Sequence, residues 1–185
     1  MTVPLASRPE WAAAIAEHAA EERTAQHLIG QLLAVEVASL AFCRLLERWA
    51  RGDAEPSTPG RRQAALRRAA DRVETALAGL ERPLGRYLLE LEADQAEGRS
   101  WFGEPGPAEL VDWEPVLERA GVRVAPHRVA AAYLELAVLV RALEGLSATV
   151  RWQSGLDAHS LWAGLFDLRE NLLGGALDDL RAIAA

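Results

Sequence analysis

Residues 28–43 read LIGQLLAVEVASLAFC, an apolar run with one carboxylate, Glu36, near its middle. On a helix the neighbours of a residue lie three, four and seven positions away, and around Glu36 all of these except Ser39 are apolar. A second apolar stripe follows the other side of the same run and comprises Leu28, Val35, Phe42, Leu46 and Trp49. A helix that is apolar on two sides is expected at the centre of a bundle, packed against more than one neighbour.

This run predicts a core helix rather than a membrane span. It is shorter than the ~20 residues that a helix needs to cross a bilayer, and it contains Gln31, Glu36 and Ser39. A buried carboxylate either finds a partner or becomes neutral. We therefore expect Glu36 to have a specific polar environment.

Composition limits the class of protein. The 185 residues are 50% hydrophobic and 6% aromatic. This balance favours a single all-helical domain that spans residues 1–185. The net charge of −7 argues against a general nucleic-acid binder, because phosphate affinity needs clustered positive charge. The single cysteine, Cys43, excludes a disulfide framework and a zinc-binding cysteine pattern. The N-terminal MTVPLASRPE lacks a basic region followed by an apolar core, so no signal peptide is predicted and the cytoplasm is the expected compartment.

The first half of the chain predicts two long helices. One runs from Pro9 to about residues 51–52, either unbroken or jointed near Gly30. After a loop at 53–60, Thr58-Pro59 caps a second helix. This helix carries apolar residues in a three–four alternation that continues across Pro83. The positions of that stripe are Leu66, Ala70, Val73, Leu77, Leu80, Leu84, Tyr87 and Leu91.

The second half predicts an irregular crossover followed by two more helices. The crossover spans about 98–126 and holds short helical turns divided by Pro115 and stopped by Gly121. A third main helix opens at Pro126 and ends around 145–149, and the last helix follows a capping box at Ser154-x-x-Asp157 and is interrupted by Gly174-Gly175. The prediction is therefore an all-α, four- to five-helix antiparallel bundle, with the crossover between the second and third main helices.

Three charged residues lie on apolar stripes of three different helices: Glu36, Glu135 and Arg169. If they converge in the bundle core, Arg169 could hold the two carboxylates or an anionic ligand. The competing interpretation is a structural ion network, or side chains that reach the surface. The sequence alone favours the structural interpretation but leaves a ligand-binding or catalytic pocket open.

A metal site is the weakest of these hypotheses. The architecture resembles ferritin-like bundles, in which Glu-x-x-His pairs supply metal ligands. That motif does not occur in this chain, so no residue is carried over from that resemblance and neither metal nor cofactor is expected.

Two further groups can be interpreted as surfaces. Five arginines fall between 61 and 72, and in so acidic a chain a solvated face is the expected explanation. Trp11, Trp101 and Trp113 lie outside the periodic stripes and could anchor a protein partner, or else seal the ends of the bundle.

The resulting functional expectation is a non-enzymatic protein that acts through homo-oligomerisation or a protein partner, with neither nucleic acid nor membrane involved. The alternative is a ligand-binding or catalytic bundle built on Glu36, Glu135 and Arg169, for which a small-molecule ligand is expected. The residues do not decide between an enzyme and a binding protein, because the sequence contains no Gly-x-Ser-x-Gly or phosphate-loop pattern.

Overall fold

The computed structural model describes residues 13, 15–16, 22–53, 58–90, 111–152, 165–166, 169 and 176–185. This part of the chain is helical and contains no strand, which confirms the predicted all-α bundle. Its main helices are α2 (Glu22–Ala50), α3 (Pro59–Glu90), α4 (Trp113–Ala120), α5 (Pro126–Trp152) and α7 (Ala176–Ala184).

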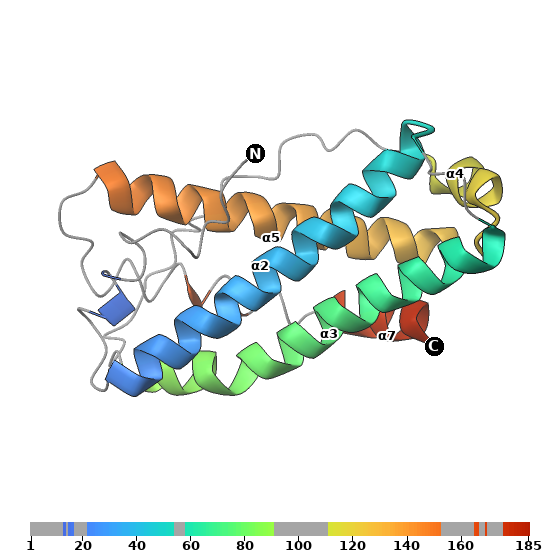
Figure 1. Ribbon diagram of the computed structural model, residues 1–185. Coiled ribbons are helices and arrows are strands. Elements are labelled where there is room, and N and C mark those ends of the chain that lie inside the picture. The colour runs from blue at the N-terminus through green and yellow to red at the C-terminus, as the bar shows by residue number, and fades with distance from the viewer. Residues whose placement is uncertain are drawn as a thin grey trace.

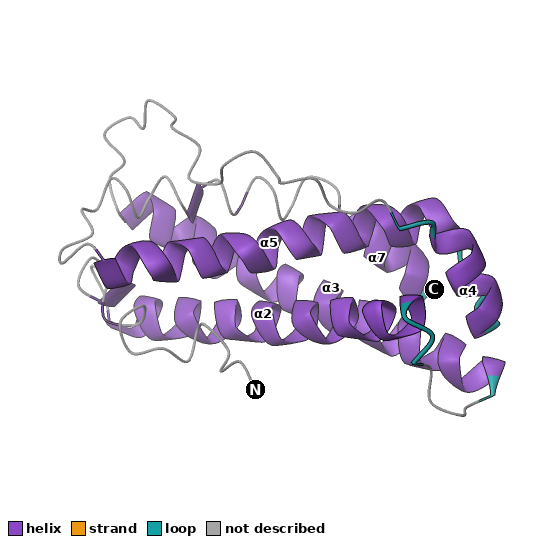
Figure 2. Cartoon of the chain, turned by 90° about the horizontal axis from the view of Figure 1, so that it is seen from above, coloured by secondary structure: helices purple, strands orange, loops and turns teal. Residues whose placement is uncertain are grey.

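The long helices α2, α3 and α5 form the body of the bundle (Figure 1). Helix α3 returns along α2 in the opposite direction, and α5 crosses behind α2. The view from above separates α2 and α5 onto two sides of the molecule (Figure 2). The short helix α4 closes the end where α3 and α5 begin, and α7 packs against α3 and α5.

Helix α2 is the central core helix that the sequence predicts. The second stripe, from Leu28 to Trp49, is buried throughout, and α2 contacts both α3 and α5. Gly30 lies inside the helix and does not interrupt it; the predicted start at Pro9 lies outside the described residues. By length and composition Ala25–Ala50 could also cross a membrane, so the apolar part of α2 is longer than the run at 28–43. A core helix has the same composition.

Helix α3 begins at Pro59, as predicted, and continues through Pro83. Every predicted stripe position from Leu66 to Tyr87 is buried; Leu91 lies outside the described residues. The hydroxyl of Tyr87 donates a hydrogen bond of 3.1 Å to the backbone carbonyl of Ile15, which ties the chain preceding α2 to α3.

The described end of the crossover is more regular than predicted. Asp112 caps α4 by accepting a hydrogen bond from the Glu114 amide, and Gly121 ends it in the left-handed conformation, with φ 65°. Pro115 does not divide the helix, because it occupies the first turn, where a missing amide hydrogen costs no helical hydrogen bond.

Helix α5 begins at Pro126, as predicted, but runs to Trp152 instead of ending at 145–149. A single glycine costs a helix only about 1 kcal/mol relative to alanine, so Gly145 does not stop it. Helix α7 begins directly after the Gly174-Gly175 pair, and the predicted capping box at 154–157 lies outside the described residues.

Candidate functional site

Glu36 is buried in α2, as its apolar neighbours predict. Its exposed fraction is 1%, and Ser39, one turn further on, is fully buried. Glu36 has an interaction of its own, whereas the Ser39 hydroxyl has no hydrogen-bond partner within the described structure. The buried face of α2 therefore carries two polar side chains, Glu36 and Ser39, one helical turn apart.

Glu135 lies on α5 and faces α7. Burial raises the pKa of this carboxyl, and the negative charge of Asp179 on α7 raises it further. Asp179 is itself paired with Arg128, one of whose guanidinium nitrogens lies 3.2 Å from the carboxylate. Glu135 Oε2 is buried without a hydrogen-bond partner in the described structure. The carboxyl group is thus held where its charged form is disfavoured.

Arg169 is helical and partly buried, and its Nε has no hydrogen-bond partner in the part of the chain that is described. Glu135 Oε2 and Arg169 Nε therefore do not pair with each other. The structure confirms that Glu36 is buried, but a pocket formed jointly by Glu36, Glu135 and Arg169 stays a prediction.

Of the three tryptophans predicted as partner anchors, only Trp113 is described. It is 4% exposed, and its ring packs against Tyr133 on α5, with centroids 5.0 Å apart. The Trp113 ring thus packs at the end of the bundle, in agreement with the alternative interpretation that these tryptophans seal the bundle ends. Trp11 and Trp101 lie outside the described residues, and a partner contact through any of the three stays a prediction.

Tyr133 also connects α5 to α2. Its hydroxyl donates to Glu47 Oε1 at 3.2 Å. Burial, together with the charge of Glu47, raises the pKa of Tyr133 to about 12, and the same two causes raise the pKa of Cys43 to about 12. Over the described residues, no three side chains of His, Cys, Asp or Glu come together as metal ligands would.

The most distinctive chemical feature is a cleft of about 610 Å³ between the first turns of α2 and the second half of α3. Its lining residues on α2 are Arg23 and His27, and those on α3 are Ala78, Gly79, Arg82, Pro83 and Arg86. No acidic side chain occurs among these lining residues. A cationic cleft is unexpected in a protein whose net charge is −7.

Helix register explains how the cleft residues meet. The side-chain oxygen of Gln31 on α2 lies so close to Gly79 that a Cβ there would be 2.7 Å from it. Because the helices are antiparallel, one turn back along α2 matches one turn forward along α3, which places His27 opposite Pro83. Each helix thus contributes a pair of basic residues four positions apart, Arg23 with His27 and Arg82 with Arg86, and such pairs share a face.

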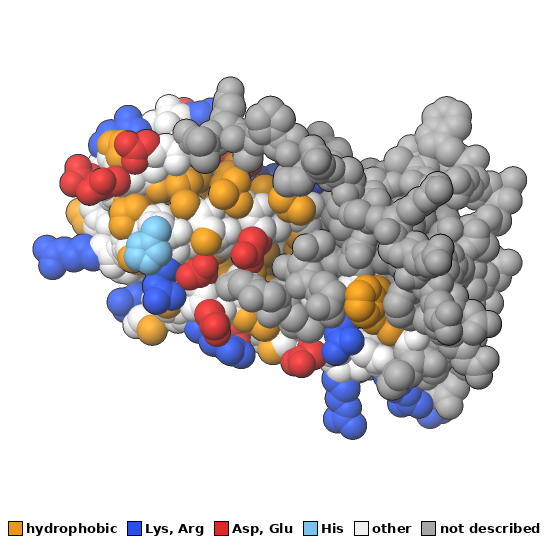
Figure 3. All heavy atoms as spheres, turned by 180° about the vertical axis from the view of Figure 1, so that it is seen from behind, with side chains coloured by type: hydrophobic (Ala, Val, Ile, Leu, Met, Phe, Trp, Pro, Cys, Tyr) orange, Lys and Arg blue, Asp and Glu red, His pale blue; other side chains and the backbone are white. Residues whose placement is uncertain are grey.

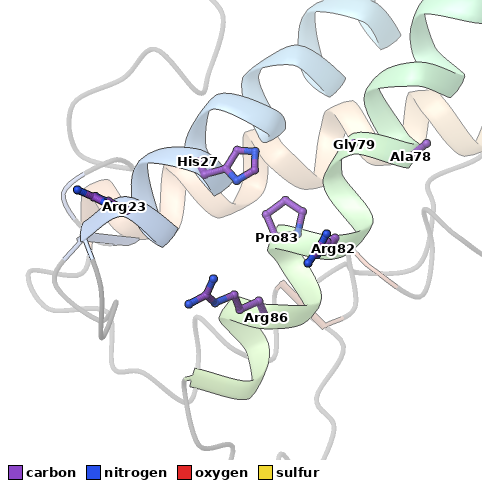
Figure 4. A pocket seen from close by; sticks show the side chains of 7 residues that line it. All are labelled: Arg23, His27, Ala78, Gly79, Arg82, Pro83 and Arg86. Carbon is purple, nitrogen blue, oxygen red and sulfur yellow. The ribbon is translucent and has the colours of Figure 1, made fainter.

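Figure 4 shows how these side chains lie. The His27 ring and the Pro83 ring lie between the helices, and Arg86 points from α3 toward the first turn of α2, while Arg23 extends away at the rim. Within the described structure, Arg23 and Arg82 make no hydrogen bond or ion pair; Arg86 has a further interaction. All four basic side chains are exposed, so they are accessible to a ligand in solution.

The arginines between 61 and 72 have a different role. Arg62 donates to the carbonyl oxygens of Arg119 and Ala120 at 3.3 and 3.2 Å, which satisfies the end of α4. Arg61, Arg67, Arg68 and Arg72 are exposed. This supports the interpretation of the cluster as a solvated face with one structural contact.

A second cleft, of about 710 Å³, lies where α3 begins against the α4–α5 turn. It is lined by both signs of charge, with Arg67 and Arg123 beside Glu118. Gln63 is already engaged, because its Oε1 accepts a 2.7 Å hydrogen bond from the Arg123 amide. The mixed charge makes this cleft a weaker candidate for an anion.

Sequence reasoning missed the cationic cleft altogether. Its signal was the two basic pairs four residues apart, one on each side of a predicted helical hairpin. Each pair alone is ordinary for a solvated helix, and only the register of the two helices, in which Gln31 lies against Gly79, brings the two pairs together.

In comparisons with known proteins, the chain matches no family model, no curated protein and no solved structure.

Proposed function

We propose that the protein is a ligand-binding helical bundle that holds a small molecule through an oxyanion group in the cleft between α2 and α3. The observation that carries this proposal is the concentration of three arginines and one histidine, without an acidic residue among the described lining, in an acidic protein. Guanidinium groups suit phosphate, sulfate and carboxylate groups, which they can contact with two parallel hydrogen bonds.

The size of the cleft favours a small molecule. Its volume of about 610 Å³ lies within the roughly 300–1,000 Å³ range of small-molecule pockets. The described lining offers no carboxylate, thiol or hydroxyl side chain. The cleft therefore supports recognition rather than covalent catalysis.

Association with itself or with a protein partner stays a prediction. Figure 3 shows hydrophobic side chains along the described part of the rear face, with acidic and basic side chains beside them. Among the described large hydrophobic residues only Val37, at 48%, is exposed. Apolar interfaces usually present a larger contiguous patch, so the cleft is the better supported candidate.

The test is a titration with inorganic phosphate at constant ionic strength, followed by calorimetry. We expect saturable binding with a Kd in the millimolar range or below, which corresponds to a binding free energy of about −4 kcal/mol or more favourable. The double variant Arg82→Gln/Arg86→Gln should bind roughly tenfold more weakly, since exposed ionic contacts contribute about 0.5–1 kcal/mol each.

The matched control is Arg68→Gln/Arg72→Gln. It makes the same charge change at the same spacing on an exposed face of α3 outside the cleft. Circular dichroism and thermal melting would verify that both double variants fold. Wild-type protein without saturable binding would overturn the proposal, and so would equal losses in the two double variants, since they would indicate a general effect of net charge.

A further inference from the structure

If the proposed cleft function holds, Pro83 narrows the chemical class of the ligand. This residue lies inside α3 and lines the cleft. Proline has no backbone amide hydrogen, so it cannot donate the hydrogen bond that the carbonyl four residues earlier accepts in a regular helix. That carbonyl belongs to Gly79, which lines the same cleft.

By helix geometry, the Gly79 carbonyl points toward the next turn of α3, whose residues also line the cleft. Helical carbonyl groups point along the axis toward the next turn, and Arg82, Pro83 and Arg86 follow Gly79 at three, four and seven positions, on one face. The proline ring also pushes this carbonyl away from the helix axis. Gly79 has no side chain to cover the oxygen and is only partly buried.

We propose that the ligand is a hydroxylated oxyanion, such as a polyol phosphate, whose anionic group lies against the arginines and whose hydroxyl group donates a hydrogen bond to the Gly79 carbonyl. A cationic donor such as an amine fits less well, because the arginines would repel it.

The test compares two phosphate esters of equal charge and similar length, glycerol 3-phosphate and propyl phosphate, which differ in their hydroxyl groups. Wild-type protein should bind the glycerol ester about threefold to tenfold more tightly, the range expected for one added neutral hydrogen bond. In an NMR experiment, the carbonyl carbon of Gly79, observed through the amide of Leu80, should shift with glycerol 3-phosphate and move much less with propyl phosphate.

Pro83→Ala restores an amide hydrogen at position 83 and thereby a helical partner for the Gly79 carbonyl. In this variant the preference should fall to within twofold, while binding of propyl phosphate persists. Equal affinities of wild-type protein for the two esters, or an unmoved Gly79 carbon, would overturn the inference and leave the anion-binding function standing. If neither ester nor inorganic phosphate binds the wild type, the proposed function itself fails.

Discussion

Gly121, which ends α4, lies against Pro59, which begins α3. A Cβ added to Gly121 would lie 2.7 Å from the Cβ and 2.9 Å from the Cγ of Pro59. Real Cβ atoms do not approach so closely, and a proline ring cannot swing aside. The two residues that signal a helix start and a helix stop in the sequence are therefore neighbours in space.

Gly121→Ala should accordingly destabilise the protein more than a positive φ alone explains. The control is Gly52→Ala, because Gly52 also has a positive φ, 80°, but has open space around its Cβ position. We expect Gly52→Ala to lower the free energy of unfolding by about 1–2 kcal/mol and Gly121→Ala to lower it clearly more. Urea unfolding measures both, and equal losses would mean that the contact with Pro59 carries no cost.

Cys43 should be almost unreactive while the protein is folded. It is buried, and its pKa is raised to about 12 by burial and by the charge of Glu47. Only the thiolate reacts with alkylating agents or aromatic disulfides, so at pH 8 modification should be slow in buffer and fast in concentrated urea. Because the chain has one cysteine, absorbance of the released aromatic thiol reports this residue alone. Rapid modification under native conditions would contradict the described packing of α2.

The hydrogen bond from Tyr87 to the Ile15 carbonyl should contribute measurably to stability. Tyr87→Phe leaves a buried carbonyl without this donor and should cost about 1 kcal/mol or more. Tyr133→Phe is the comparison, because its hydroxyl donates to the Glu47 carboxylate in a partly buried position, where water can replace it. A larger loss of unfolding free energy in Tyr133→Phe would contradict this assignment.

The parts of the fold that follow from local pattern could be predicted from the sequence. The three–four alternation along α3 requires no knowledge of its neighbours, and it continues across Pro83 as expected. The burial of Glu36 likewise follows from the apolar residues one turn away. In contrast, the predicted end of α5 at 145–149 is wrong, because a single glycine such as Gly145 costs too little to stop a helix.

The cationic cleft could not be predicted, because it depends on how two helices align. Moving α3 by one turn against α2 would separate Arg86 from Arg23 without changing either helix's own pattern. In the observed register the Gln31 side chain lies against Gly79, and nothing in the local sequence signals that contact. Trp113 shows the same limitation, since its burial depends on how the short helix α4 meets Tyr133.

The raised pKa of Glu135 predicts how the stability of the fold depends on pH. Burial, and secondly the charge of Asp179, raises its pKa in the folded protein, so the folded state binds this proton more tightly than the unfolded state. The resulting stability is present below the ordinary glutamate pKa of 4.5 and is lost as the pH rises through the folded value. At neutral pH the ionised carboxylate therefore weakens the fold.

Glu135→Gln should consequently raise the melting temperature at pH 7.5, and this gain should shrink as the pH is lowered toward 4. The gain should be modest, because Glu135 is only partly buried and solvent screens its charge. Glu81→Gln, the same chemical change at an exposed position of α3, is the control and should leave the melting temperature nearly unchanged at both pH values. A variant at position 135 that melts lower than wild type at pH 7.5 would indicate that the carboxylate is held by a cation there, as a pocket shared with Arg169 requires.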